Sequence, residues 1–243
     1  MRTQIITSRN VEQSKSRHRR VGLLYKRRMK RFRAVLFDLD GTLADTLTDL
    51  ANAVNHAIAT LGCPTHPLPA YRHFVGDGAR NLILRTLPAD KASLADKALA
   101  LMRAHYEAHC FDETRLYPGI QELVPVLFRQ GLKLAVFSNK PDDFTKRMVA
   151  HYFPDSPFVA VRGQRANLPI KPDPTVALQI AEELGISPSE WIYLGDTNTD
   201  MHTATAAGMF PVGVLWGFRE REELVEAGAL KLIARPDELL QLL

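Results

Sequence analysis

Short apolar runs rich in β-branched residues recur along this chain, and helical patterns separate the later ones. Near-continuous apolar strands that alternate with helices are typical of a parallel sheet with helices on both faces. The sequence therefore predicts an α/β fold built on a doubly wound, Rossmann-like parallel sheet. The expected strands are 33–38, 132–138, 158–163, 191–196 and 211–216, with 230–234 as a candidate sixth.

The later helices are marked by periodic apolar residues and by boundary signals. Pro174 and Gly185 bracket one of them as a start signal and a stop signal. The expected helices in this half are 142–153, 174–185 and 198–208, and "PDELLQLL" at the C-terminus is a candidate closing helix.

A long segment between the first two expected strands carries little strand signal and is far longer than a crossover needs. Its pattern predicts helices, over 47–62, near 67–75, over 78–87 and over 91–110. We expect residues 45–115 to form a helical subdomain, called the cap here, inserted into an α/β core of residues 31–44 and 116–243. The helical pattern over 118–131 then returns the chain to the sheet as a crossover helix.

The basic character of the whole chain comes from its first 30 residues. Residues 1–30 hold ten Lys and Arg against one acid, Glu12, which is a net charge of +9; subtracted from the chain's +4, this leaves −5 for residues 31–243. A basic arm could bind nucleic acid or act as an acid-poor transit peptide. Because the segment lacks interleaved aromatic residues and a clear amphipathic pattern, we expect a disordered leader, or sequence upstream of a start at Met29.

Composition otherwise indicates an ordinary globular protein. Hydrophobic residues make up 46% of the chain and charged residues 24%, and no apolar run approaches the length of a membrane span. Cys63 and Cys110 have no metal-site spacing and form no disulfide framework, so a reduced, cytoplasmic setting is the default. We expect a monomer or a homodimer.

Polar and charged residues stand where the expected parallel strands end. Asp38 and Asp40 follow the first strand, Ser138, Asn139 and Lys140 the second, Lys171 lies in the loop after the third, and Asp196 ends the fourth, with Asp200 one helical turn on. Ligands bind outside the carboxyl ends of such strands. Carboxylate oxygens suit a hard cation, usually Mg²⁺, and a cation would relieve the repulsion among these aspartates.

An oxyanion site is expected beside this cation site. Ser138 and Asn139 precede a helix whose start is marked by Pro141, so backbone N–H groups there can receive a phosphate, and Lys171 adds a point charge. Since these positions hold no cysteine and no Ser/His pair, the natural nucleophile is an aspartate. A second carboxyl close by can serve in turn as acid for the leaving oxygen and as base for water.

The stretches "DLDGTLADT", "SNK", "KPDP" and "GDTNTD", in this order, resemble the four motifs of the haloacid dehalogenase-like hydrolase superfamily. The resemblance covers nearly all of residues 32–243, and the inserted helices match the family's small helical cap. It implies that Asp38 is the nucleophile and a metal ligand, and that Asp40 is the general acid and base, with its main-chain carbonyl on the metal. It further implies that Ser138 and Lys171 bind the phosphoryl group with support from Asn139, that Asp196 ligates Mg²⁺, and that Asp200 orients the metal shell.

Within the superfamily the chain looks most like the phosphoglycolate phosphatase group, through "FDLDGTLADT", "FVGDGARNLILRTL" and "SNKP". The leading hypothesis is a Mg²⁺-dependent phosphatase of a small phosphorylated metabolite, with 2-phosphoglycolate as the best guess, acting through an aspartyl-phosphate. The alternatives are a sugar-phosphate mutase or a phosphatase of another metabolite on the same scaffold. A non-catalytic protein that binds nucleic acid through its basic arm is disfavoured by the intact acid set.

Overall fold

The computed structural model describes residues 32–243, which form one compact unit up to Leu242. The leader expected over 1–30 lies outside the described residues. A six-stranded sheet forms the centre of the unit, in the order β5-β4-β1-β6-β7-β8, and every neighbouring pair is parallel. The strands are β1 (Ala34–Phe37), β4 (Lys133–Pro141), β5 (Phe158–Gln164), β6 (Trp191–Gly195), β7 (Phe210–Val214) and β8 (Lys231–Ile233). The predicted α/β fold and its sixth strand are confirmed.

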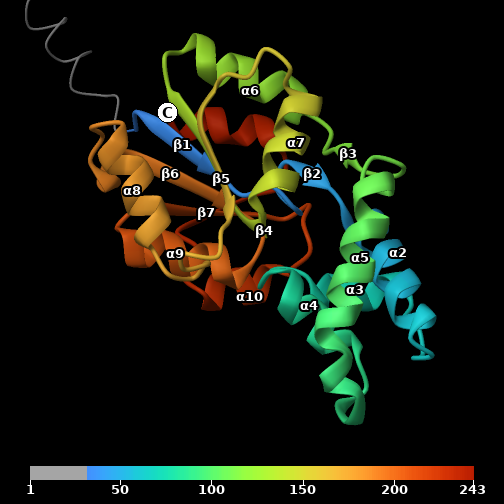
Figure 1. The fold of residues 1–243 in the computed structure, drawn as a ribbon. Coiled ribbons are helices and arrows are strands. Elements are labelled where there is room, and N and C mark those ends of the chain that lie inside the picture. Colours follow the sequence, from blue (N-terminus) through green and yellow to red (C-terminus); the bar gives the residue numbers. More distant parts are fainter. Residues whose placement is uncertain (1–31) are drawn as a thin grey trace, which may run out of the picture. The chain divides into compact units, whose positions relative to one another are not determined.

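Helices cover both faces of the sheet (Figure 1). On one face lie α8 (Thr175–Glu183) and α9 (Asn198–Ala207), whose apolar side chains pack with Leu36, Phe137 and Trp191 in one fully buried cluster. Across the other face lie α6 (Ile120–Arg129) and α7 (Asp142–Tyr152), with the 3₁₀ segment η3 (Pro236–Leu242) beside α6, whereas α10 (Arg221–Glu226) packs against α9. Because the strands are covered on both sides, they need the near-continuous apolar sequence from which they were predicted.

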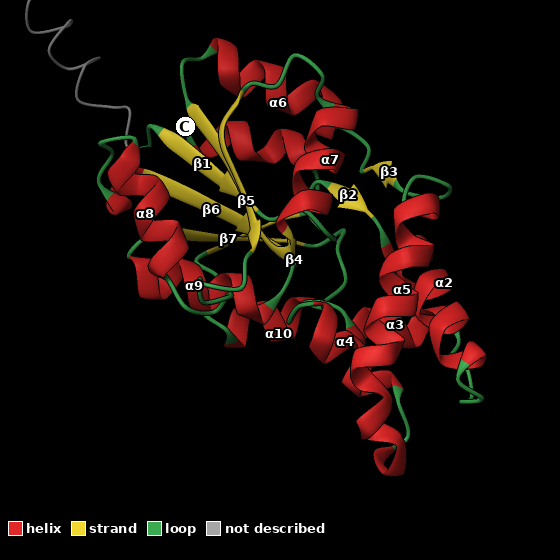
Figure 2. Cartoon of the chain, viewed as in Figure 1, coloured by secondary structure: helices red, strands yellow, loops and turns green. Residues whose placement is uncertain are grey.

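A second group of helices occupies the segment between the first two long strands (Figure 2). They are α2 (Leu47–Thr60), α3 (Leu68–Phe74), α4 (Ala79–Thr86), the 3₁₀ segment η1 (Ala89–Leu94) and α5 (Ala95–His109). The two ends of the segment are joined by a short antiparallel ribbon, in which β2 (Ala44–Asp45) pairs with β3 (Arg115–Leu116). The buried Asp49 of α2 reinforces this junction, since it accepts hydrogen bonds from the backbone of Glu113 and Thr114 and from the Thr114 hydroxyl.

Several details differ from the sequence expectations. The helix expected over 91–110 begins as the 3₁₀ segment η1 and becomes α-helical at Ala95, and the expected closing helix is 3₁₀ rather than α. Both are short stretches, in which i→i+3 bonding is common. β4 continues three residues past the predicted end, because Pro141 still pairs with Gln164 after a register shift. Among the described helices, none has both the length and the apolar character needed to cross a membrane.

Candidate active site

Three aspartates, two after neighbouring strands and one on a helix, meet at the carboxyl end of the sheet. Asp38 follows β1, Asp196 follows β6, and Asp200 lies in the first turn of α9. One carboxylate oxygen of each lies within 4.8 Å of the others, and all three residues are buried. The parallel pairing of β1 with β6, which aligns Phe37 with Leu194, brings the first two together.

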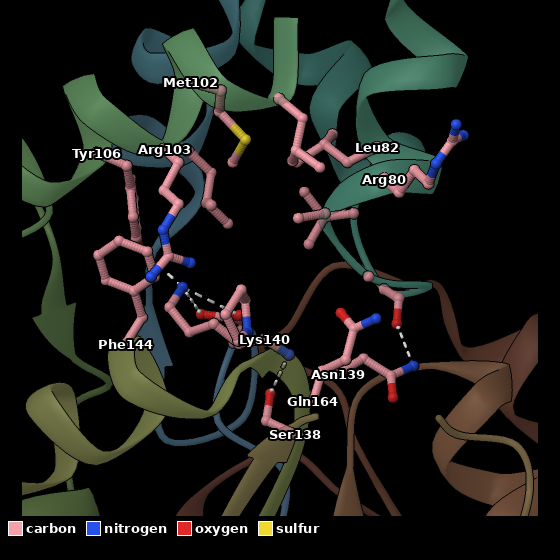
Figure 3. A pocket seen from close by; sticks show the side chains of 18 of the residues that line it. Arg80, Leu82, Met102, Arg103, Tyr106, Ser138, Asn139, Lys140, Phe144 and Gln164 are labelled. Atoms are coloured by element: carbon pink, nitrogen blue, oxygen red, sulfur yellow. Dashed lines mark hydrogen bonds and ion pairs between the residues drawn. The ribbon is translucent and has the colours of Figure 1, made fainter. Parts of the chain in front are cut away.

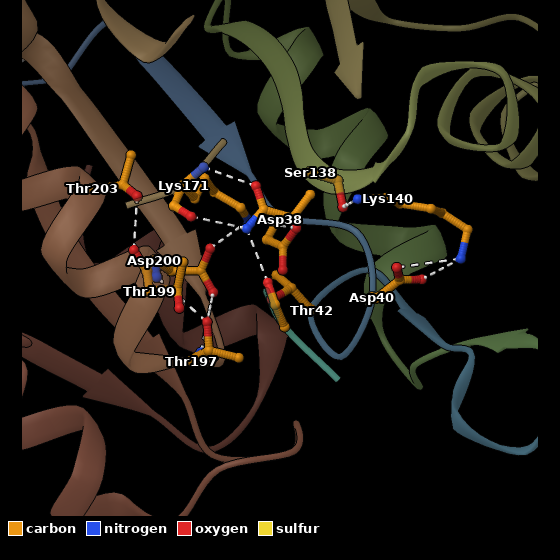
Figure 4. A network of polar contacts seen from close by, with 12 residues as sticks. Asp38, Asp40, Thr42, Ser138, Lys140, Lys171, Thr197, Thr199, Asp200 and Thr203 are labelled. Carbon is orange, nitrogen blue, oxygen red and sulfur yellow. Dashed lines mark hydrogen bonds and ion pairs between the residues drawn. The ribbon is translucent and has the colours of Figure 1, made fainter. Parts of the chain in front are cut away.

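Lys171 lies in the middle of this acidic cluster (Figure 4). Its Nζ is 2.8 Å from Asp38 Oδ1 and 2.7 Å from Asp200 Oδ1, and its side chain is only 2% exposed. Asn139 fixes the loop that carries Lys171: its Oδ1 accepts a hydrogen bond from the Lys171 N–H, and its Nδ2 donates to the Lys171 carbonyl. Asn139 thus holds the backbone of Lys171 in place.

Asp196 is held on both of its oxygens. The Thr42 hydroxyl donates to Oδ1 at 3.1 Å, and the Phe218 N–H donates to Oδ2 at 2.8 Å. The chain can pass this close only because residue 41 is glycine: its φ is +86°, and a Cβ there would lie 2.1 Å from Asp196 Oδ2. Thr42 and Gly41 therefore position the predicted metal ligand.

Asp200 combines a structural and an electrostatic role. Its Oδ2 accepts hydrogen bonds from the Thr197 N–H and hydroxyl, which completes a capping box at the start of α9. Its Oδ1 receives the Lys171 ammonium. The sequence assigns Asp200 to the surroundings of the metal, and the structure places one of its oxygens in the same acidic group as Asp38 and Asp196.

Burial perturbs the ionisation of this cluster. Desolvation raises the pKa of Asp38 to about 7 and outweighs the opposing attraction of Lys171. Desolvation, together with the charges of Asp200 and Asp38, raises the pKa of Asp196 well above its usual range. Burial also opposes the charge of Lys171, but Asp200 and Asp38 outweigh it and raise the pKa of the ammonium. Three buried carboxylates therefore share one buried cation.

This imbalance fits a second cation. Asp38 Oδ1 is buried, and the Lys171 ammonium that it contacts at 2.8 Å also contacts Asp200. Buried carboxylates that outnumber their cationic partners are costly unless a further cation offsets their charge. The all-oxygen donor set of Asp38, Asp196 and Asp200 is suited to a hard divalent ion.

Asp40 lies apart from the three clustered aspartates. Lys140 Nζ contacts its Oδ1 at 2.9 Å and its Oδ2 at 3.2 Å, and the pair stands to one side of the Lys171 group in Figure 4. The prediction that the Asp40 main-chain carbonyl ligates the metal stays a prediction. Ser138 is buried at the end of β4, where its hydroxyl accepts a hydrogen bond from the Lys140 N–H at 3.3 Å.

A cavity of about 380 Å³ opens above these residues. Asp38, Asp40, Ser138, Asn139 and Lys171 line it, so the structure brings five predicted site residues to one space. Figure 3 shows Ser138, Asn139 and Lys140 at one end, with Met102, Arg103 and Tyr106 of α5 facing Leu82 of α4 across the cavity. One end of the cavity is therefore polar, and its walls toward the cap helices are largely apolar.

Sequence reasoning assigned no role to Lys140, Tyr106 or Thr42. Lys140 stands in the quoted "SNK" stretch, which was the signal for it, but nothing local indicates that its side chain meets Asp40, one hundred residues away in sequence. Tyr106 is one of several apolar or aromatic positions on an amphipathic helix. Tyr106 differs from the other positions because its hydroxyl contacts Lys140 of β4, and only the tertiary structure shows this contact.

Comparisons with known proteins agree with the fold. The haloacid dehalogenase-like hydrolase family matches residues 35–214. A phosphoglycolate phosphatase from Pseudomonas putida is 37% identical over 193 residues, which cover 76% of this chain and 70% of the relative. A phosphoglycolate phosphatase from Nitrosospira multiformis is 34% identical over 80% of this chain and 88% of its own length.

Solved structures give the same result. A haloacid dehalogenase-like family hydrolase from Streptococcus pneumoniae superimposes with a TM-score of 0.79 at 26% identity, over 88% of this chain and 99% of that one. A hydrolase from Pseudomonas syringae superimposes with a TM-score of 0.72 at 25% identity, over 86% and 96% of the two chains. The chain belongs to the haloacid dehalogenase-like hydrolase family and is a phosphatase of that type.

Proposed function

We propose that this phosphatase hydrolyses a small phosphomonoester, with 2-phosphoglycolate as the first candidate, through an aspartyl-phosphate on Asp38. The observation that carries the proposal is the meeting of Asp38, Asp196 and Asp200 with Lys171, in a cluster whose members Asp38 and Lys171 line the cavity. The candidate substrate rests on the relatives, since the Pseudomonas and Nitrosospira proteins are phosphoglycolate phosphatases.

In the first half of the proposed reaction, an Asp38 carboxylate oxygen attacks phosphorus. The bond from phosphorus to the leaving alcohol oxygen breaks, and that oxygen takes a proton from Asp40. Lys171, which is fixed by Asn139, and the hydroxyl of Ser138 offset the negative charge of the phosphoryl oxygens.

In the second half, water attacks the phosphorus of the aspartyl-phosphate. Asp40 accepts a proton from that water, and the bond from phosphorus to Asp38 breaks. Inorganic phosphate leaves and the Asp38 carboxylate is restored. One carboxyl thus serves as acid and then as base, so both half-reactions end with Asp40 in the state that the next one needs.

We propose that Asp38, Asp196 and the Asp40 carbonyl hold Mg²⁺, with Asp200 beside them. When bound, Mg²⁺ offsets the charge of the phosphoryl oxygens and lets the clustered carboxylates ionise together. The hydrogen bonds from Thr42 and Phe218 hold Asp196 in place for this role.

We also propose that residues 45–115 act as a cap over the cavity. Two sets of contacts join this segment to the core. On one side the Asn139 amide donates to the Gly76 carbonyl at 3.0 Å, and the Thr199 hydroxyl donates to Asp77 at 2.9 Å. On the other side, the Lys140 ammonium donates to the Tyr106 hydroxyl at 2.8 Å.

The proposed function is tested by a screen of phosphorylated metabolites that includes 2-phosphoglycolate, with Mg²⁺ and with a chelator. We expect release of inorganic phosphate that requires Mg²⁺ and is lost in the Asp38→Asn variant, while the thermal unfolding of the variant shows an intact fold. Metal-independent hydrolysis, or full activity of the variant, would contradict the proposed mechanism.

A further inference from the structure

Two buried lysines divide the carboxylates of the cavity between them. Lys171 binds Asp38 and Asp200, whereas Lys140 binds Asp40. Each lysine side chain is only 2% exposed, so both ammonium groups are committed to these partners rather than to water. The nucleophile and the proton-transfer group of the proposed mechanism therefore each have a cation of their own.

We propose that Lys140 and Tyr106 are positioning residues for Asp40. Through Tyr106, the position of the Asp40 carboxylate depends on how helix α5 packs against the core. The proposal rests on the proposed function, in which Asp40 moves the proton. It adds two residues to which the motif resemblance gives no role.

The Lys140 ammonium restricts the positions of both of its partners, Asp40 and Tyr106. The ammonium contacts both oxygens of Asp40, at 2.9 and 3.2 Å, and donates to the Tyr106 hydroxyl at 2.8 Å. It also stands 4.7 Å from the centre of the Tyr106 ring. A carboxylate held on both oxygens cannot rotate freely, and proton transfer depends on such fixed geometry.

Tyr106 is itself fixed by the packing of α5 against α7. Its ring packs edge-on against Phe144, with centroids 5.1 Å apart, and the residue is 2% exposed. Arg103, one turn earlier on α5, forms an ion pair with Asp143 and lies over the Phe144 ring. The Tyr106 hydroxyl, which accepts the hydrogen bond from Lys140, thus belongs to the cap segment, whereas Lys140 and Asp40 belong to the core.

The arrangement also matters for the proton that moves during the reaction. Because the Lys140 ammonium contacts both oxygens of Asp40, it holds that carboxyl group in one orientation beside the cavity. Protonation of a basic leaving group depends on this orientation. A leaving group that is a weak base needs little protonation and gains little from this.

This difference gives a test that a purely structural role would not pass. We compare kcat/KM for an alkyl phosphate, whose alkoxide is strongly basic, with kcat/KM for p-nitrophenyl phosphate, whose phenolate is not. Both kcat/KM values depend only on the steps up to the release of the alcohol. The later hydrolysis of the aspartyl-phosphate therefore does not affect them. The variants are Lys140→Met, Tyr106→Phe and Lys140→Arg.

For Lys140→Met we expect kcat/KM to fall about 100-fold on the alkyl phosphate, the lower end of what general acid catalysis contributes, and severalfold at most on p-nitrophenyl phosphate. For Tyr106→Phe the loss of one hydrogen bond predicts a fall of about fivefold on the alkyl ester alone. Lys140→Arg keeps the cation and should recover part of the activity. The matched control is Tyr152→Phe, whose hydroxyl donates to the Thr114 carbonyl outside the cavity lining and whose loss should affect both esters equally.

Equal losses on the two esters, or no loss on the alkyl ester, would overturn the positioning role. If Lys140→Met does not fold, Tyr106→Phe decides alone, because it removes a single oxygen. If the wild type hydrolyses no ester, the proposed function is wrong, and the positioning role is wrong with it. The wild-type assay therefore separates this outcome from a failure of the positioning role alone.

Discussion

Replacing Lys171 with methionine removes the one cation that binds Asp38 and Asp200. The ammonium lies 2.8 and 2.7 Å from their oxygens, and the three side chains are 2%, 7% and 0% exposed. Methionine keeps the length and apolar character of the stem but removes the positive charge beside the three clustered carboxylates. Breaking a buried ion pair on one side costs about 3–5 kcal/mol.

The loss is measured by thermal unfolding near neutral pH, first in chelator and then with Mg²⁺. In a chain of this size each kcal/mol shifts Tm by about 2–4 °C, so the variant should unfold about 6–20 °C below the wild type in chelator. Mg²⁺ should raise the Tm of the variant more than that of the wild type, because the ion then supplies the missing positive charge.

The matched control is Lys146→Met. Lys146 forms an ion pair with Asp142 on the surface of α7, where its side chain is 51% exposed, and such pairs contribute about 0–1 kcal/mol. If Lys171→Met unfolds within about 2 °C of this control, the buried cluster does not depend on its lysine and the electrostatic account of the site is wrong.

Two further predictions concern the same cluster. Gly41→Ala should lower the free energy of unfolding more than Gly62→Ala in thermal unfolding, since both have positive φ but only residue 41 would place a Cβ against Asp196; equal losses would contradict this. In chelator, the contribution of Asp38 to stability should be most favourable below about pH 4 and should fall as pH rises from about 4 to about 7, because the pKa of Asp38 is about 7 in the folded state and 3.8 ordinarily. The Mg²⁺-induced rise in Tm should therefore be larger at about pH 8 than at about pH 5, and an equal rise would refute this linkage.

The sequence was sufficient for the sheet because its strands are buried on both faces. The run 191–196 is apolar up to its last residue, and the aspartates that end the runs 33–38 and 191–196 mark the carboxyl edge. The parallel order then follows from general rules, so Asp38 and Asp196 could be expected to meet.

The contacts between the cap segment and the core could not be predicted in this way. β2 and β3 are two residues each and carry no periodicity, and the pairing of Asp45 with Arg115 depends on where the inserted helices return. Lys140 and Asp40 are one hundred residues apart, and they meet because β1 and β4 are neighbours in the sheet. Local patterns hold no information on such distances.

The burial of Asp49 illustrates the same limit. On sequence it is an acidic residue in the first turn of an amphipathic helix, which normally faces water. In the structure it is 2% exposed and satisfies the backbone of Glu113 and Thr114 where the inserted segment ends. A partner more than sixty residues away determines its role.

The most direct test of the central claim is to look for the phosphoryl group on Asp38. The wild-type protein, mixed with Mg²⁺ and a phosphomonoester that it hydrolyses and then quenched in acid, should carry one phosphoryl group on the peptide that contains Asp38. We expect mass spectrometry to detect it, hydroxylamine to remove it, and the Asp38→Asn variant to lack it. Undiminished turnover by that variant, or a phosphoryl group on another residue, would contradict the account.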